Sequence, residues 1–111
     1  PLWLAPEQVR VLPISDKFTD YADKVLAALK AKGMRATLDS SNERVNAKIK
    51  DAQEMKVPYM LVVGGRDAEA GTVSVRERFA GDLGALSLED FVNQAKAEID
   101  SKGKSRVVVS K

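Results

Sequence analysis

The sequence predicts a single α/β domain, with a mixed sheet of four or five strands flanked by three helices. Its first half alternates short apolar runs with amphipathic stretches, which is typical of parallel strands joined by helices. Its centre holds two consecutive strand-like runs, 59–63 and 72–78, which predict an antiparallel hairpin. With 111 residues, 44% of them hydrophobic, the chain is long enough for one modest core.

Residues 9–38 predict a strand-helix-strand unit with parallel strands and a right-handed crossover. The run 9–14 forms the first strand, and Ser15-Asp16 then supplies a side-chain oxygen that caps a helix N-terminus. Apolar residues at helical spacing continue to Leu29, and Gly33 ends this helix. The second strand is expected at 34–38.

The second helix is expected to begin near Ser41, because Ser40 and Glu43 have the spacing of a capping box. It should end near Lys56, just ahead of a proline. Its inward residues are expected to be Val45, Ile49 and Ala52. The residues expected on its solvated faces are basic: Arg44, Lys48 and Lys50.

The two central strands are expected to differ in burial, the first on both faces and the second on one face only. The five apolar residues at 59–63 predict a central strand buried on both faces. In 72–78, Val73 and Val75 alternate with polar residues, so the other face should present Arg76 and Arg78 to solvent. This arginine-bearing strip, together with the helix that leads into the hairpin, is the predicted working surface.

The rest of the chain predicts a turn, a third helix and a tail. Residues 79–85 indicate a turn with room for one very short strand. Ser87 is expected to cap the third helix, with Leu86 and Phe91 as a hydrophobic staple. The polar, basic end of the chain is expected to fray, with Val107–Val109 at most an edge strand.

The composition excludes several classes of site. The chain has no cysteine and no histidine, which removes disulfides, thiolate nucleophiles, the commonest metal ligand and the commonest general base. No metal site or catalytic grouping is therefore expected. The lack of cysteine agrees with a reducing compartment, and no apolar run approaches the length of a membrane span. Because the net charge is only +2, the placement of the basic residues is more informative than their number.

The candidate recognition residues each have two interpretations. Arg76 and Arg78 either solvate the hairpin or recognise nucleic acid, since a guanidinium matches O6 and N7 of guanine. Asp67 and Glu69 are either loop carboxylates or acceptors for the amino and imino groups of a base. Asn42 is either a first-turn residue of the second helix or an amide that reads an unpaired base edge.

The basic residues of the second helix form either a solvated face or a phosphate track with salt-dependent affinity. They are Arg44, Lys48, Lys50 and Lys56. Base stacking would have to use Phe79, Trp3 or an arginine plane, because the other aromatic residues fit the core. Gly64-Gly65 is interpreted as a turn, because no phosphate-binding glycine motif opens a helix there.

Three segments carry a family resemblance: WLAP followed by QV at 3–9, SSNERV followed by KI at 40–49, and VPYMLVVG followed by GTVSVR at 57–76. On these segments the chain resembles the C-terminal anticodon-binding domain of class II aminoacyl-tRNA synthetases. The prolyl, glycyl and histidyl enzymes share this domain, and the WLAP-QV opening favours the threonyl branch. The resemblance implies a mixed five-stranded sheet with three helices, which agrees with the order derived from the residues.

The resemblance also implies an RNA-recognition module without chemistry or cofactor of its own. Such a domain binds the anticodon loop of a tRNA, here the threonine tRNA, while a separate catalytic module using ATP, Mg²⁺ and Zn²⁺ forms threonyl-tRNA. The implied organisation is a linker from that module at 1–7, the anticodon-binding domain at 8–101 and a basic tail at 102–111.

Individual site residues follow from the resemblance. The family's asparagine at the start of the second helix matches Asn42, and its arginine at the end of the VAVR-like strand matches Arg76, assigned to the middle guanine of the anticodon. The family's acidic residue aligns with Asp67, where glutamate would be usual, so either Asp67 or Glu69 is assigned to the third anticodon base. The family's basic positions that hold lysine here are Lys50 and Lys56.

The expected protein is therefore a cytoplasmic tRNA-binding domain without membrane contact, a monomer as this fragment and part of a homodimer in its parent. Two other interpretations stay open. One is a free-standing paralogue of the same fold that serves as an accessory or protein-interaction module, for which altering Arg76 would hardly matter. The other is a small-molecule-binding α/β domain that uses the crevice near Asn42 and Gly64.

Overall fold

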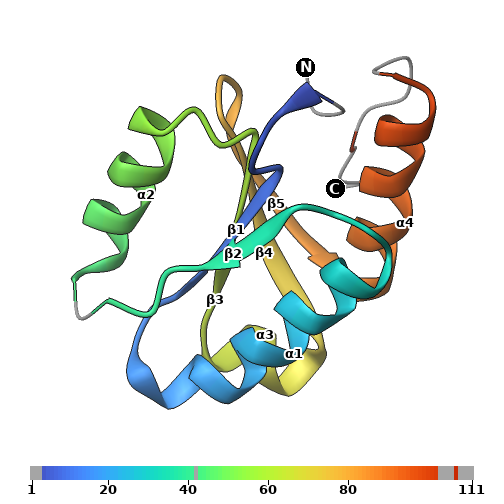
Figure 1. Ribbon diagram of the computed structural model, residues 1–111. Coiled ribbons are helices and arrows are strands. Elements are labelled where there is room, and N and C mark those ends of the chain that lie inside the picture. The colour runs from blue at the N-terminus through green and yellow to red at the C-terminus, as the bar shows by residue number, and fades with distance from the viewer. Residues whose placement is uncertain (1–3, 42, 103–106, 108–111) are drawn as a thin grey trace.

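The computed structural model describes residues 4–41, 43–102 and 107, which form a five-stranded mixed sheet with helices on both faces (Figure 1). The strands are β1 (Val9–Pro13), β2 (Ala36–Leu38), β3 (Tyr59–Val63), β4 (Thr72–Glu77) and β5 (Gly81–Ser87). The helices are the 3-10 turn η2 (Asp16–Phe18), α1 (Thr19–Ala31), α2 (Val45–Glu54), α3 (Gly65–Ala70) and α4 (Leu88–Asp100). Within these described ranges, no helix combines the length and the apolar character that crossing a bilayer requires.

The sheet has the order β2-β1-β3-β4-β5 and consists of two halves that differ in strand direction. β1 runs parallel to β2 and β3, whereas β4 runs antiparallel to β3 and β5. The parallel half follows from the helical crossovers through α1 and α2, and the antiparallel half from the short links on either side of β4. The predicted mixed sheet is confirmed.

Helices α1 and α4 cover one face of the sheet, and α2 covers part of the other (Figure 1). The larger core lies under α1 and α4, where Leu29 and Phe91 are fully buried against β1, β3 and β4. The smaller core joins Ala52 of α2 to Leu12 of β1 and Met60 of β3. The predicted apolar stripes of the long helices are therefore the faces that pack.

Helix α4 is held to β3 by apolar packing and by a buried hydrogen bond. Ser87 caps the helix as predicted, since its Oγ accepts the amide of Asp90 at 3.1 Å. The rings of Phe91 and Tyr59 meet edge to face with centroids 5.6 Å apart. The Tyr59 hydroxyl donates to Glu98 Oε1 at 2.6 Å, and burial together with this carboxylate raises the pKa of Tyr59.

Helix α2 begins later than predicted. Its first residue is Val45, and Arg44 holds the N-cap position without a side-chain cap bond, so the predicted capping box is wrong. The amide of Ser41 instead donates to Asp39 Oδ1 at 3.0 Å, which turns the chain before the helix starts. The helix ends at Glu54, close to its predicted end.

The segments on either side of β4 are more regular than predicted. The glycine-containing connection before β4 contains the short helix α3, which ends at Gly71 in a left-handed conformation with φ of 72°. β5 has 7 residues, so the expectation of a very short strand is wrong. Its pairing with β4 shifts register between Val75 and Arg76, and this β-bulge was not visible in the glycine-rich pattern of 79–85.

Part of the predicted tail packs into the domain. Val107 is 7% exposed and belongs to the larger core, so the expectation of fraying is wrong for this residue. The rest of the predicted edge strand Val107–Val109, like Trp3, lies outside the described residues.

We expect Phe91→Ala to lower the free energy of unfolding by about 3–5 kcal/mol, because it empties the centre of the larger core. Urea denaturation followed by circular dichroism measures this loss. Met55→Ala is the control, because Met55 is 63% exposed and its truncation should change stability by less than about 0.5 kcal/mol. Similar losses for the two variants would contradict the described packing of α4.

Candidate functional site

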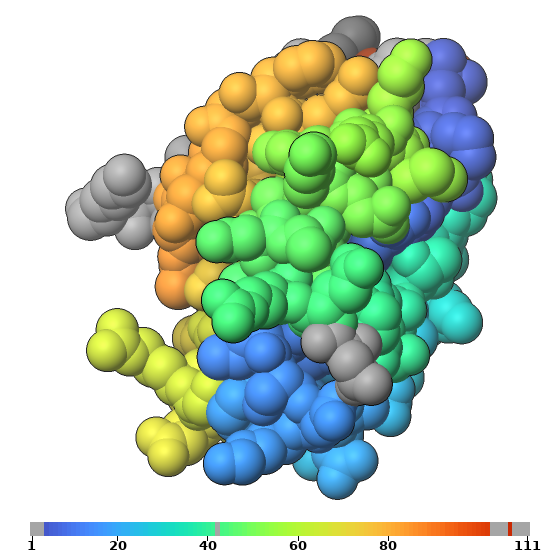
Figure 2. Space-filling view, turned by 90° about the vertical axis from the view of Figure 1, so that its left-hand side faces the viewer, coloured from blue at the N-terminus to red at the C-terminus, as the bar shows by residue number. Residues whose placement is uncertain are grey.

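The α2 side of the sheet carries the polar strip that the sequence predicts for β4. Met60, a member of the smaller core under α2, pairs in register with Arg76, so the two side chains share one face of the sheet. Thr72, Ser74 and Arg76 are half-buried on this face. Figure 2 shows that face, where α2 in green lies beside the β4–β5 hairpin in orange, with α3 in yellow below the hairpin.

Arg76 has an unused donor in a shielded position. Its Nε atom is buried and has no hydrogen-bond partner among the described residues. The pairing of β4 with β5 shifts register beside this residue, and the extra residue lies in β5, because Val75 pairs with Gly84 and Arg76 with Asp82. An unsatisfied buried donor costs about 1–3 kcal/mol, and only an acceptor that reaches Nε itself would recover that cost.

The two candidate carboxylates have different environments. Asp67 is 8% exposed, and its carboxylate accepts hydrogen bonds from the Gly64 amide at 3.2 Å and the Thr72 hydroxyl at 2.7 Å. The hydroxyl of Ser74 lies 3.5 Å from the same carboxylate. Asp67 therefore ties the start of α3 to β4, whereas Glu69 is exposed on α3.

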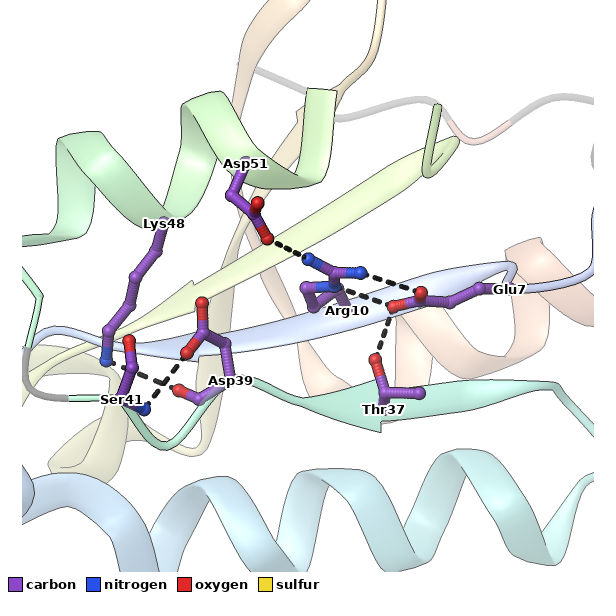
Figure 3. Close-up of polar contacts among 7 residues, drawn as sticks. All are labelled: Glu7, Arg10, Thr37, Asp39, Ser41, Lys48 and Asp51. Carbon is purple, nitrogen blue, oxygen red and sulfur yellow. Dashed lines mark hydrogen bonds and ion pairs between the residues drawn. The ribbon is translucent and has the colours of Figure 1, made fainter. Parts of the chain in front are cut away.

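Lys48 is not on a solvated face, and this prediction is wrong. Its side chain is 3% exposed, and its ammonium donates to the carbonyl oxygens of Pro13 at 3.0 Å and Asp39 at 3.3 Å. These carbonyls lie at the end of β1 and just after β2, so Lys48 ties α2 to the carboxyl edge of the parallel strands (Figure 3). A lysine held in this way is not part of an exposed phosphate track.

Three of the other predicted basic residues are exposed to solvent, and the fourth, Arg78, is partly buried and contacts Phe79. Arg44, Lys50 and Lys56 are exposed. The guanidinium carbon of Arg78 lies 4.5 Å from the ring centroid of Phe79, a cation–π contact at the turn after β4. Asn42 lies outside the described residues.

The loop before α2 is nevertheless fixed at the end that leaves β2. Asp39 accepts the amide of Ser41, and its carbonyl oxygen accepts from Lys48. Burial raises the pKa of Asp39, but the hydrogen bonds from Ser41 and the charges of Lys48 and Arg10 outweigh it and lower that pKa overall. This ionised carboxylate holds the chain immediately beside position 42.

Sequence reasoning missed an ion-pair network centred on Arg10. Its Nε atom lies 2.7 Å from Glu7, and its Nη1 atom lies 2.8 Å from Asp51 of α2 (Figure 3). The hydrogen bond from Arg10, aided by one from Thr37, lowers the pKa of Glu7 against the effect of burial. The spacing of residues 7 and 10 does not predict this network. Arg10 and Asp51 are far apart in the sequence, and only the packing of α2 brings them together.

This network lines a groove of about 680 Å³ between β2, β1 and α2. Four of the lining residues carry carboxylates. Only Arg10 carries a guanidinium, and its ion pairs with Glu7 and Asp51 already occupy that group. Such a groove repels phosphate. The β4 strip with Arg76, together with the exposed Arg44, Lys50 and Lys56 in and beside α2, is therefore the surface suited to a polyanion. Within the described ranges, no group of three or more acidic side chains is arranged to hold a metal ion.

Comparison with known proteins gives one matching family. The family model described as "Anticodon binding domain" matches residues 8–98. Among curated proteins, the threonine–tRNA ligase of Desulforamulus reducens is 48% identical over 102 residues. The threonine–tRNA ligase of Caldanaerobacter subterraneus subsp. tengcongensis is 51% identical over the same length. Each alignment covers 92% of this chain but only 16% of the relative, so the chain corresponds to a small, non-catalytic part of full-length ligases.

Solved structures agree with this match. The RNA-binding domain of threonyl-tRNA synthetase from Cryptosporidium parvum superposes with a TM-score of 0.83 and 32% identity, covering 87% of this chain and 24% of that one. The histidyl-tRNA synthetase of a Nostoc species superposes with a TM-score of 0.79 and 19% identity, covering 86% of this chain and 23% of that one. The second likeness shows the shared fold alone.

We expect Asp67→Ala to lower the free energy of unfolding by about 1–3 kcal/mol, because the Gly64 amide and the Thr72 hydroxyl lose their acceptor. Glu69→Ala removes an exposed carboxylate from the same helix and should change stability by less than about 0.5 kcal/mol. Chemical denaturation of both variants measures the difference. Equal stability of the two variants would show that Asp67 does not hold α3 to β4.

We expect Lys48→Met to cost about 1–3 kcal/mol of stability, because the carbonyl oxygens of Pro13 and Asp39 lose a charged donor. Lys50→Met is the matched control, since it makes the same change at an exposed position of α2. Thermal unfolding of the two variants gives the comparison. A Lys48→Met protein as stable as the wild type would contradict this structural role.

Proposed function

The chain belongs to the anticodon-binding domain family, and we propose that it recognises the anticodon loop of threonine tRNA. Because the chain spans 16% of the length of its curated relatives, the activity of the whole protein is part of this proposal. The parent protein would ligate threonine to its tRNA, with ATP, Mg²⁺ and Zn²⁺ held by a separate catalytic module. It would act as a homodimer in the cytoplasm, while the present fragment would be monomeric.

The unpaired Nε donor of Arg76 is the observation that carries the proposal. A guanidinium donates in a fixed fork that matches O6 and N7 of guanine, the middle base of the threonine anticodon. Arg76 is half-buried and its Nε atom is buried, which restricts this side chain before RNA arrives. A preorganised donor loses less conformational entropy on binding than a mobile one, which favours base reading over general attraction.

Under this proposal some carboxylates and lysines contact the RNA, and others position the elements that do. Glu69 is the candidate acceptor for the third anticodon base, because it is exposed while Asp67 is occupied by Gly64 and Thr72. Asp67 would act by positioning α3. Lys48 likewise would position the loop before α2, which leads to Asn42, the proposed amide contact to a base.

Three exposed cations and the partly buried Arg78 would supply the affinity for the RNA backbone. Each phosphate neutralised on a single strand changes the slope of log affinity against log salt by about 0.7. Lysine contributes to this affinity as a point charge, without the bidentate geometry of arginine. The residues proposed for this role are Arg44, Lys50, Lys56 and Arg78.

The proposal is tested by anisotropy titration of a labelled threonine anticodon stem-loop against the same hairpin with its middle guanine changed to adenine. We expect the wild type to prefer guanine by about tenfold, which corresponds to roughly 1.4 kcal/mol. Arg76→Ala should lose this preference. Arg76→Lys should also lose it while keeping the salt dependence, because the charge remains and the fork does not.

Lys24→Ala is the charge-matched control, since Lys24 is exposed on α1, on the other side of the sheet. It should keep the wild-type preference for guanine. If the wild type binds both hairpins equally and only salt changes the affinity, the strip is an electrostatic surface and base reading by Arg76 is wrong.

A further inference from the structure

The turn between β4 and β5 is held in one shape by a carboxylate. Glu77, the last residue of β4, accepts the backbone amide of Phe79 at 3.1 Å and that of Ala80 at 2.8 Å. Gly81 then returns the chain to the sheet with φ of 78°, a left-handed conformation that glycine adopts easily. The backbone at this turn is therefore defined by hydrogen bonds and glycine geometry, independently of the Phe79 side chain.

This ordered turn exposes an aromatic ring. Phe79 is 81% exposed, although phenylalanine is usually buried. The guanidinium of Arg78 lies against the ring, 4.5 Å from its centroid. The backbone of Arg78 is in turn fixed, because its amide donates to the carbonyl oxygen of Pro58 at 2.9 Å. Most of the ring surface stays open to a partner.

The ring lies at the end of the Arg76 strip among charges of both signs: Arg78 lies against it, Glu77 accepts its backbone amide, and Asp82 pairs across the sheet with Arg76. Phe79 follows Arg76 by three residues at the end of the same strand. The exposed Lys56 lies two residues before Pro58, whose carbonyl receives the Arg78 amide. In Figures 1 and 2 the hairpin and the end of α2 that leads into β3 lie side by side. Arg78 is therefore the cation in contact with the ring, and Lys56 belongs to the neighbouring connection.

We propose that the paired side chains of Phe79 and Arg78 form a stacking platform for one unpaired base of the bound RNA loop. This inference rests on the proposed RNA-binding function and adds a subsite to it. Aromatic rings stack bases without strong sequence preference, because every base has a π-face, and an adjacent arginine adds a cation–π contribution. The positive charge of Arg78 fits a phosphate next to that base. A single projecting ring paired with a guanidinium fits a nucleobase better than a protein interface, which needs a contiguous apolar core.

The test uses the threonine anticodon stem-loop with 2-aminopurine at each loop position in turn, except the middle guanine. We expect one position to be quenched on binding to the wild type and to Phe79→Trp. The same position should lose its quench with Phe79→Ala and with Phe79→Leu, because leucine keeps the apolar character but has no π-face. Affinity should fall about fivefold or more in the Ala and Leu variants, the lower end of the usual effect of losing one stacked base.

Two readouts separate this subsite from its alternatives. The Phe79 variants should keep the preference for guanine and the wild-type melting temperature, because the ring is 81% exposed and belongs to neither core cluster. Arg76→Ala should show the reverse pattern, keeping the quench and losing the preference. Guanine discrimination with no Phe79-dependent quench at any position would overturn the platform and leave the proposed function standing. If the wild type does not bind the stem-loop, both proposals fail.

Discussion

Burial of one face of the sheet under α1 and α4 is the interaction on which the rest of the structure depends. The alternating valines of β1 and β4 and the apolar run of β3 supply that face, and Phe91 fills its centre. The main core lies on that face. On the opposite face, α2 covers only β1 and β3. The strip of β4 on that opposite face is therefore free for a polar function, and a stable sheet supports it.

The charged side chains around this strip form two groups, those that are hydrogen-bonded within the domain and those that keep an unused donor. Asp67, Lys48 and Arg10 use their hydrogen bonds inside the domain, so each connects a helix or loop to a strand. Arg76 keeps a shielded donor without a partner among the described residues. The first group supports the fold, since buried charges are stable only when their bonding capacity is used, whereas Arg76 has unused bonding capacity. Recognition residues held on a rigid sheet lose little entropy when they meet a ligand.

Much of the architecture could be predicted because it depends on local periodicity. The strand-helix-strand unit, the alternation in β4 and the cap at Ser87 are all set within a few residues of sequence. Helix α2 started later than expected because Asp39 turns the chain, and a capping-box spacing cannot show which local acceptor an amide will choose. The bulge beside Arg76 depends on the register between β4 and β5, which no single segment specifies.

The class of fold, the arginine strip and, through three short segments, the family could all be derived from the order of the residues. The accessibility of individual charged side chains, by contrast, follows only from the folded arrangement. Lys48 and Lys50 lie two positions apart on one helix, yet only the first points toward the carboxyl edge of the sheet and is buried there. Asp67 and Glu69 are separated in the same way on α3. Burial and hydrogen-bond partners depend on which elements pack together, and the type of a residue does not reveal which residues will surround it in space.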